Sequence, residues 1–208
     1  MLISNTKEGR KDGSYTRLFG NKDLGALISR VHSSSISSGN ELEKIIESMA
    51  ETIDDLDLFL KEKTFKKGTF LITKKTIKKS ILKSNQEPDF LIIRIEDNHC
   101  KIIELKDGDT FDTKKAKGEK QNLINFQNNI SNKIPYTTSI YICSFNQENK
   151  DLIKAGMKNE FDSSEIMTGK EFCQLLNINY DKILERRKND QKKNIQFFLN
   201  EINRITKK

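Results

Sequence analysis

The stretch that decides the fold is PDFLIIRIEDNHCKIIELK, residues 88–106 of a 208-residue chain. Phe90–Ile95 is an apolar run with one charged member, and Cys100–Leu105 is a second run rich in isoleucine. Short apolar runs bounded by turn residues predict β-strands, and Asp97-Asn98 supplies the chemistry of a tight turn. The stretch therefore predicts a β-hairpin.

The hairpin is expected to gather three charged side chains. With a two-residue turn at Asp97-Asn98, antiparallel pairing places Asp89 opposite Lys106. Opposed residues share a face of the sheet, and so do residues two apart on one strand. Asp89, Glu104 and Lys106 are therefore expected on one face, at one end of the hairpin. A one-residue error in the turn would move this pairing.

Two carboxylates and an amine in this arrangement suit phosphodiester hydrolysis. Carboxylate oxygens bind Mg²⁺ and leave coordination positions for water and phosphate. The metal polarises a phosphoryl group and lowers the pKa of a bound water, which Lys106 can orient. The alternative is a lysine-rich hairpin with ordinary surface charges, in which Asp89 starts a strand and Glu104 pairs with Lys106. Such a pair costs desolvation when no metal satisfies it.

Pro88-Asp89 followed by Glu104-Leu105-Lys106 resembles the signature of the PD-(D/E)xK nuclease superfamily. Other E/D-x-K triplets of the chain, such as those at 112–114 and 148–150, lack both the preceding Pro-Asp and the apolar strand. The resemblance implies an α/β fold, with a mixed central β-sheet flanked by helices in a restriction-endonuclease-like core. It also implies Mg²⁺-dependent DNA cleavage, with Asp89, Glu104 and Leu105 contacting the metal and Lys106 beside the attacking water.

A further acidic residue is expected from the segment that precedes the hairpin. Gly39–Glu43 resembles the G-x-x-x-E element of many members of the superfamily, which implies a catalytic role for Glu43, with Glu41 as the alternative. Asn40 is a suitable N-cap for a first long helix from Glu41 to about residue 60. A short helix at 23–31 and a polar Gly/Ser-rich segment at 33–40 are expected before it.

The order of the remaining predicted elements also indicates an α/β fold. Strands are expected at 70–72, at 137–143 and within 161–167, and helices at 113–131, 147–158, 170–176 and 181–206. The chain is predicted to form a single nuclease domain over residues 1–208. Its catalytic core is expected at about 39–145, followed by a C-terminal helical part at about 146–208.

The charge balance is compatible with a polyanionic partner. The formal net charge is +7 and the sequence pI is about 9.2, and Lys and Arg on one face displace counterions condensed on phosphates. A lysine-dense segment lies at 61–83. The residues predicted to bind nucleic acid are Lys74, Lys75, Lys78, Lys120 and Gln121. A solvated helix surface is the alternative for Lys120 and Gln121.

Among nucleases of this kind, the chain resembles type II restriction endonucleases. Its size, the absence of a fused helicase or ATPase, and the runs Asp107–Lys115 and Thr168–Phe172 support this resemblance. It implies hydrolysis at a short specific sequence in double-stranded DNA, by a homodimer. Two alternatives remain open: a structure-specific repair or recombination nuclease of the same fold, and a non-catalytic basic nucleic-acid-binding protein.

The cysteines, the N-terminus and the C-terminal helix indicate the cell compartment and the mode of assembly. Three separated cysteines without a CxxC spacing indicate core residues rather than disulfides or a zinc site. The N-terminus lacks the apolar run of a signal peptide and no stretch is long enough to span a membrane, so we expect a cytoplasmic protein. The apolar positions of the C-terminal helix are expected either to pack internally or to form a dimer surface: Phe197, Phe198, Leu199, Ile202 and Ile205.

Overall fold

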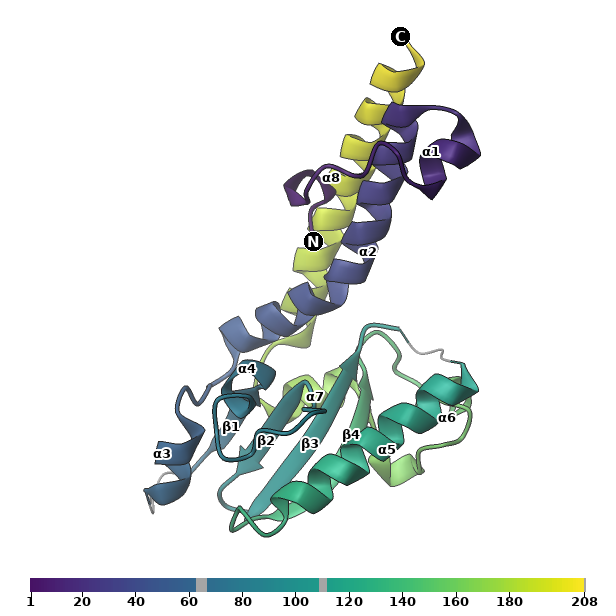
Figure 1. The fold of residues 1–208 in the computed structure, drawn as a ribbon. Helices are drawn as coiled ribbons and strands as arrows, with labels where there is room; N and C mark the ends of the chain where they lie inside the picture. Colours follow the sequence, from purple (N-terminus) through teal and green to yellow (C-terminus); the bar gives the residue numbers. More distant parts are fainter. Residues whose placement is uncertain (63–66, 109–111, 208) are drawn as a thin grey trace. The chain divides into compact units, whose positions relative to one another are not determined.

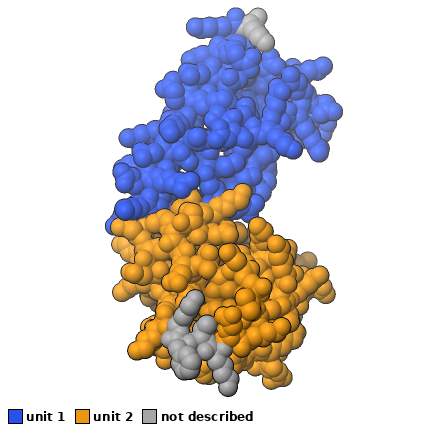
Figure 2. All heavy atoms as spheres, turned by 90° about the vertical axis from the view of Figure 1, so that its left-hand side faces the viewer, with its two compact units in different colours: residues 1–42, 181–208 blue, residues 43–180 orange. Residues whose placement is uncertain are grey.

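The computed structural model describes residues 1–62, 67–108 and 112–207. Two compact units are distinguished in Figure 2: unit 1 comprises residues 1–42 and 181–208, and unit 2 comprises residues 43–180. The expectation of one nuclease domain, with a core at about 39–145 and a C-terminal part at about 146–208, stays a prediction. Lys63 and Lys66 of the lysine-dense segment and residues 109–111 of the run Asp107–Lys115 lie outside the described residues.

A five-stranded mixed β-sheet forms the centre of unit 2 (Figure 1). The first three strands pair antiparallel, and the third, fourth and fifth pair parallel. The predicted α/β class with a mixed sheet is confirmed, and the last expected strand is a short one at the sheet edge. In spatial order the strands are β1 (Thr69–Thr73), β2 (Phe90–Arg94), β3 (His99–Lys106), β4 (Thr137–Ser144) and β5 (Ile166–Thr168).

The β2–β3 hairpin forms as predicted, but its turn is longer than expected. Phe90 pairs with Ile103, and the turn occupies residues 95–98 instead of Asp97-Asn98 alone. Asn98 has a φ of 49°, a left-handed conformation that asparagine tolerates better than most residues. The prediction of a two-residue turn was therefore wrong.

The longer turn changes the partners but not the faces. Continuing the observed register by one residue places Asp89 beside Glu104, whereas the sequence prediction placed it beside Lys106. Because the pairing shifts by two residues and side chains alternate with a period of two, Asp89, Glu104 and Lys106 still share a face.

Helices cover both faces of the sheet in unit 2. α5 (Thr113–Ile130) lies along one face in Figure 1, and its Leu123 and Phe126 share a core with Leu91 and Ile102. Phe90 faces the opposite way and lies against Phe172, with their ring centroids 6.0 Å apart. The other helical elements of unit 2 are α3 (Leu56–Lys61), α4 (Lys74–Ile77), α6 (Lys150–Gly156), η2 (Ser163–Glu165) and α7 (Gly169–Leu175).

The longest helix among the described residues, α2 (Lys22–Met49), differs from the sequence prediction in two respects. It is continuous through the Gly/Ser-rich segment at 33–40, so no loop interrupts it and Asn40 is not an N-cap. Ser34 is buried, and its hydroxyl donates to the Arg30 carbonyl at 2.9 Å, which satisfies a polar side chain inside the helix. The helix also ends at Met49, not near residue 60. Packing has here overridden the weak helix propensity of serine and glycine.

Unit 1 joins the two ends of the chain. It contains η1 (Ile3–Asn5), α1 (Ser14–Phe19), the first part of α2 and most of α8 (Tyr180–Thr206). The Ile3 amide donates to Asn194 Oδ1 at 2.8 Å, and Asn194 Nδ2 donates to the Met1 carbonyl at 2.8 Å. These bonds tie the N-terminal segment to α8. Within the described part of the chain, every helix is too short or too polar to cross a bilayer.

Candidate active site

The end of the β2–β3 hairpin brings the three predicted catalytic residues together. Asp89 precedes β2, and its Oδ2 accepts a hydrogen bond from the Leu105 amide at 3.0 Å. Lys106 Nζ donates to Glu104 Oε1 at 2.6 Å. All three side chains are largely buried, with exposed fractions of 11% for Asp89, 13% for Glu104 and 16% for Lys106. The Asp89 carboxylate is thus fixed directly onto the strand that carries the other two.

Two further residues complete the charged cluster. Lys74, at the start of α4, extends its Nζ to 3.2 Å from Asp89 Oδ1, and its amide donates to the Asp89 carbonyl at 3.0 Å. Glu119 of α5 accepts from Lys106 Nζ at 2.8 Å. Each hairpin carboxylate therefore has a lysine partner, and Lys106 bridges two glutamates.

Sequence reasoning missed Glu119, although the sequence contains a signal for it. Glu119 precedes Leu123 by four residues and Phe126 by seven, so it lies on the stripe of α5 that faces the sheet. A glutamate on a core-facing stripe needs a partner, and Lys106 supplies it. The pairing itself depends on how α5 lies across β3, which the helix pattern alone does not specify.

The electrostatics of the cluster follow from burial and crowding. Burial raises the pKa of Glu104 to about 7, with the Asp89 carboxylate as the next contribution, while Lys106 opposes the shift. Burial alone would lower the pKa of Lys106, but Glu104 and Glu119 outweigh it and raise the pKa above its usual range. In the same way, Asp89 raises the pKa of Lys74 against the effect of burial. The cluster therefore favours added positive charge.

Glu43 and its alternative Glu41 lie in different surroundings. Burial raises the pKa of Glu43, and Asp89 raises it further, while Lys74 and Lys106 act in the opposite direction. These influences bring Glu43, near the end of α2, into the electrostatic field of the hairpin cluster. Glu41 instead forms an ion pair with the amino group of Met1 within unit 1.

The donor set fits a hard divalent cation such as Mg²⁺. Among the described residues, no three His, Cys, Asp or Glu side chains converge closely enough to hold a metal by themselves. Asp89 and Glu104 would therefore supply two carboxylate ligands, and the remaining ligands would come from the backbone and from water. The N–H and C=O of one strand residue are directed to the same side. The Leu105 carbonyl therefore points toward the side on which its amide binds Asp89. Two carboxylates, a carbonyl and water are ligands that Mg²⁺ accepts.

A polar pocket of about 240 Å³ adjoins the cluster. Glu104 and Glu119 form part of its wall, and Lys78, Asn85 and Asn122 contribute cationic and amide groups. Such groups are donors for phosphate oxygens. The pocket is therefore chemically suited to a phosphate group next to the carboxylates.

The residues predicted to bind nucleic acid fall into three situations. Lys74 forms an ion pair with Asp89, whereas Lys75 and Lys78 are exposed. Lys120 Nζ lies 2.8 Å from both Glu165 Oε2 and the Glu160 carbonyl, away from the hairpin carboxylates. Gln121 is exposed, and its amide donates to Asn125. Contact of any of these five with DNA stays a prediction.

Comparison with known proteins identifies the class. The chain is 46% identical over 208 residues to a type II restriction enzyme, covering 95% of this chain and 92% of that relative. It therefore belongs to the family of type II restriction enzymes, as the sequence resemblance implied. The relative is HhaII of Haemophilus parahaemolyticus. No family model matches the chain, and no solved structure matches it.

Proposed function

We propose that the protein is a Mg²⁺-dependent type II restriction endonuclease of the PD-(D/E)xK kind, which hydrolyses double-stranded DNA at a short specific sequence. The observation that carries the proposal is the cluster of Asp89, Glu104 and Lys106 at the end of the hairpin, with the Leu105 amide bound to Asp89 at 3.0 Å. Membership of the type II restriction enzyme family supports DNA as the substrate.

The residues of the chain divide the chemistry between them. Asp89, Glu104 and the Leu105 carbonyl are the proposed metal ligands, and a bound Mg²⁺ supplies polarisation of the phosphoryl group and a water of lowered pKa. Lys106 is held between Glu104 and Glu119. Its ammonium group can orient the attacking water and stabilise negative charge on the phosphate. Glu43 adds a further carboxylate, whose pKa is influenced by Asp89, Lys74 and Lys106.

We further propose that cutting both strands requires a homodimer, because one centre on one hairpin cuts one strand at a time. Two copies related by a two-fold axis match the symmetry of a palindromic site. Of the apolar positions on the C-terminal helix, Ile205 is buried, whereas Leu199 is 51% exposed and the neighbouring Ile195 is 62% exposed. Internal packing therefore accounts for only some of the apolar residues of this helix.

The test is incubation of the purified protein with a long DNA of mixed sequence in Mg²⁺, followed by sizing and end-mapping of the fragments. Discrete fragments that share one end sequence are expected, together with no cutting in EDTA. A smear, or cuts confined to branched DNA, would indicate a structure-specific nuclease. DNA binding without any cutting would indicate a non-catalytic protein.

A further inference from the structure

The net charge of the chain is distributed unequally between the two units. Unit 1 contains 15 Lys and Arg residues against 8 Asp and Glu, whereas unit 2 contains 22 of each. The whole excess of +7 therefore belongs to the unit that lacks the hairpin carboxylates. A separate reason for this positive charge is needed, because the candidate active site does not explain it.

Part of this excess lies on α8, one side of which carries a regular stripe of exposed polar side chains. Starting at Lys182, polar residues recur at alternating intervals of four and three, which keeps them on one side of the helix. None of the eight is acidic or apolar, and every one is exposed. The stripe consists of Lys182, Arg186, Asn189, Lys193, Gln196, Asn200 and Asn203 of α8, with Lys207 directly after the helix.

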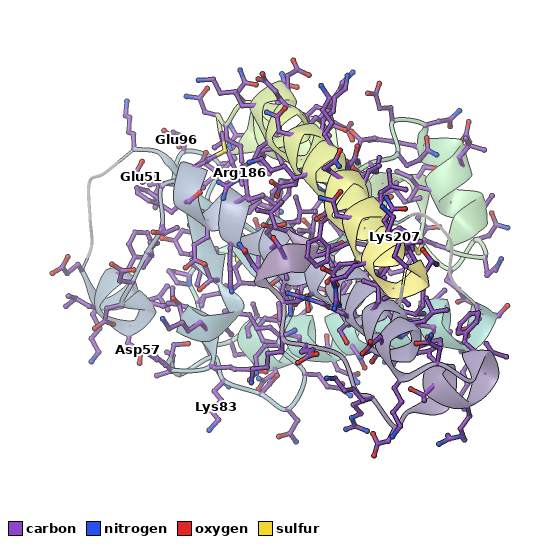
Figure 3. The ribbon with its side chains drawn as sticks, turned by 90° about the horizontal axis from the view of Figure 1, so that it is seen from above. Glu51, Asp57, Lys83, Glu96, Arg186 and Lys207 are labelled. Carbon is purple, nitrogen blue, oxygen red and sulfur yellow. The ribbon has the colours of Figure 1, made fainter. Side chains whose placement is uncertain are left out.

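The acidic residues beside the stripe are partly neutralised within unit 1. Asp190 accepts from the Met1 amino group at 2.8 Å, and Glu201 is paired with Arg204 at 2.7 Å. Glu185 also borders the stripe, and Asp181 directly precedes its first residue. Arg186 and Lys207, both labelled in Figure 3, lie toward opposite ends of the helix. The stripe is therefore long and positively charged.

We propose that this stripe of α8 is a docking surface for the sugar-phosphate backbone of duplex DNA. Lys, Arg, Asn and Gln are among the side chains that contact phosphates, and such contacts carry no sequence information directly. At 1.5 Å per residue the stripe spans roughly 37 Å, about one turn of B-DNA. The inference rests on the proposed function only in its choice of DNA, and it assigns affinity to a surface outside the catalytic hairpin.

The experiment compares two double variants that remove the same charge from the same unit. Arg186→Gln/Lys193→Gln alters the stripe, whereas Lys7→Gln/Lys22→Gln alters exposed lysines of unit 1 outside α8. Binding to a mixed-sequence DNA duplex is measured in EDTA by fluorescence anisotropy over a series of salt concentrations. Circular dichroism checks that both variants are folded.

The stripe variant is expected to bind more weakly, and the slope of log affinity against log salt is expected to fall by roughly two, about 0.9 for each lost phosphate contact. The control variant should keep both the wild-type slope and the wild-type cleavage pattern. Equal losses in the two variants, or none in the stripe variant, would overturn the inference. Wild-type protein that binds DNA but never cuts it would overturn the proposed function instead.

Discussion

Each carboxylate of the hairpin cluster is stabilised by a neighbour that a metal or a substrate would have to replace or share. Asp89 lies between the Leu105 amide and Lys74, and Glu104 lies beside Lys106. In a largely buried site such charges are costly unless they are paired. The raised pKa of Glu104, about 7, is the clearest sign of that cost.

This raised pKa predicts how stability changes with pH. Between about pH 4.5 and 7 the folded protein holds a proton on Glu104 that the unfolded chain has released. The contribution of Glu104 to the free energy of unfolding therefore falls as pH rises through this window. Urea unfolding in EDTA at pH 5 and pH 8 measures it. Glu104→Gln should gain stability relative to wild type at the higher pH, and an unchanged or reversed difference would contradict the predicted shift.

Glu43 offers a second prediction at the residue scale, with Glu41 as its control. Glu43→Gln should reduce the cleavage rate by roughly tenfold or more, because the variant removes a carboxylate within the field of the cluster. Glu41→Gln should cut DNA normally, since Glu41 pairs with the N-terminal amino group. Single-turnover cleavage over a range of Mg²⁺ concentrations gives both values. A fully active Glu43 variant would remove this residue from the proposed mechanism.

At the scale of elements, the sheet and most helices were predictable because their apolar patterns are local. Phe90–Arg94 is marked by a continuous apolar run, His99–Lys106 by buried apolar residues among half-buried polar ones, and α5 by its periodic apolar stripe. The hairpin register was off by two residues, since Asn98 admits a longer turn. The contacts of Glu119 and Lys74 were not predictable, because they join elements distant in sequence.

The continuity of α2 was also not predictable from the sequence. Serine and glycine are weak helix formers, and their tertiary contacts do not appear in a sequence pattern. This continuity can be tested at two glycines of the same helix. A Cβ at Gly39 would meet nothing within 4 Å, so Gly39→Ala should stabilise the protein by about 0.5–1 kcal/mol. A Cβ at Gly25 would approach the Thr16 amide nitrogen within 2.6 Å, so Gly25→Ala should destabilise. Thermal unfolding of both variants is the measurement. A destabilised Gly39→Ala protein would instead favour a loop at 33–40.

At the scale of the whole molecule, the exposed apolar residues of α8 bear on assembly. If Ile195 and Leu199 lie in the interface of the proposed homodimer, Ile195→Ser/Leu199→Ser should shift sedimentation from dimer toward monomer at micromolar concentration. The variant should then nick one strand of a plasmid instead of cutting both. Ile81→Ser, which alters an exposed apolar residue of unit 2, is the control. Wild-type protein that sediments as a monomer with and without DNA would end the dimer proposal while sparing the nuclease.

The most direct measurement of the central claim is Mg²⁺-dependent cleavage of one DNA by wild type, Asp89→Asn and Glu148→Gln, with binding of each protein to that DNA recorded in parallel. Glu148 belongs to the other E-x-K triplet and is paired with Lys170 at 2.8 Å. Discrete fragments are expected from wild type and Glu148→Gln, and at least a hundredfold slower cleavage is expected from Asp89→Asn, with binding largely retained. Cleavage by Asp89→Asn at close to the wild-type rate would contradict the central claim.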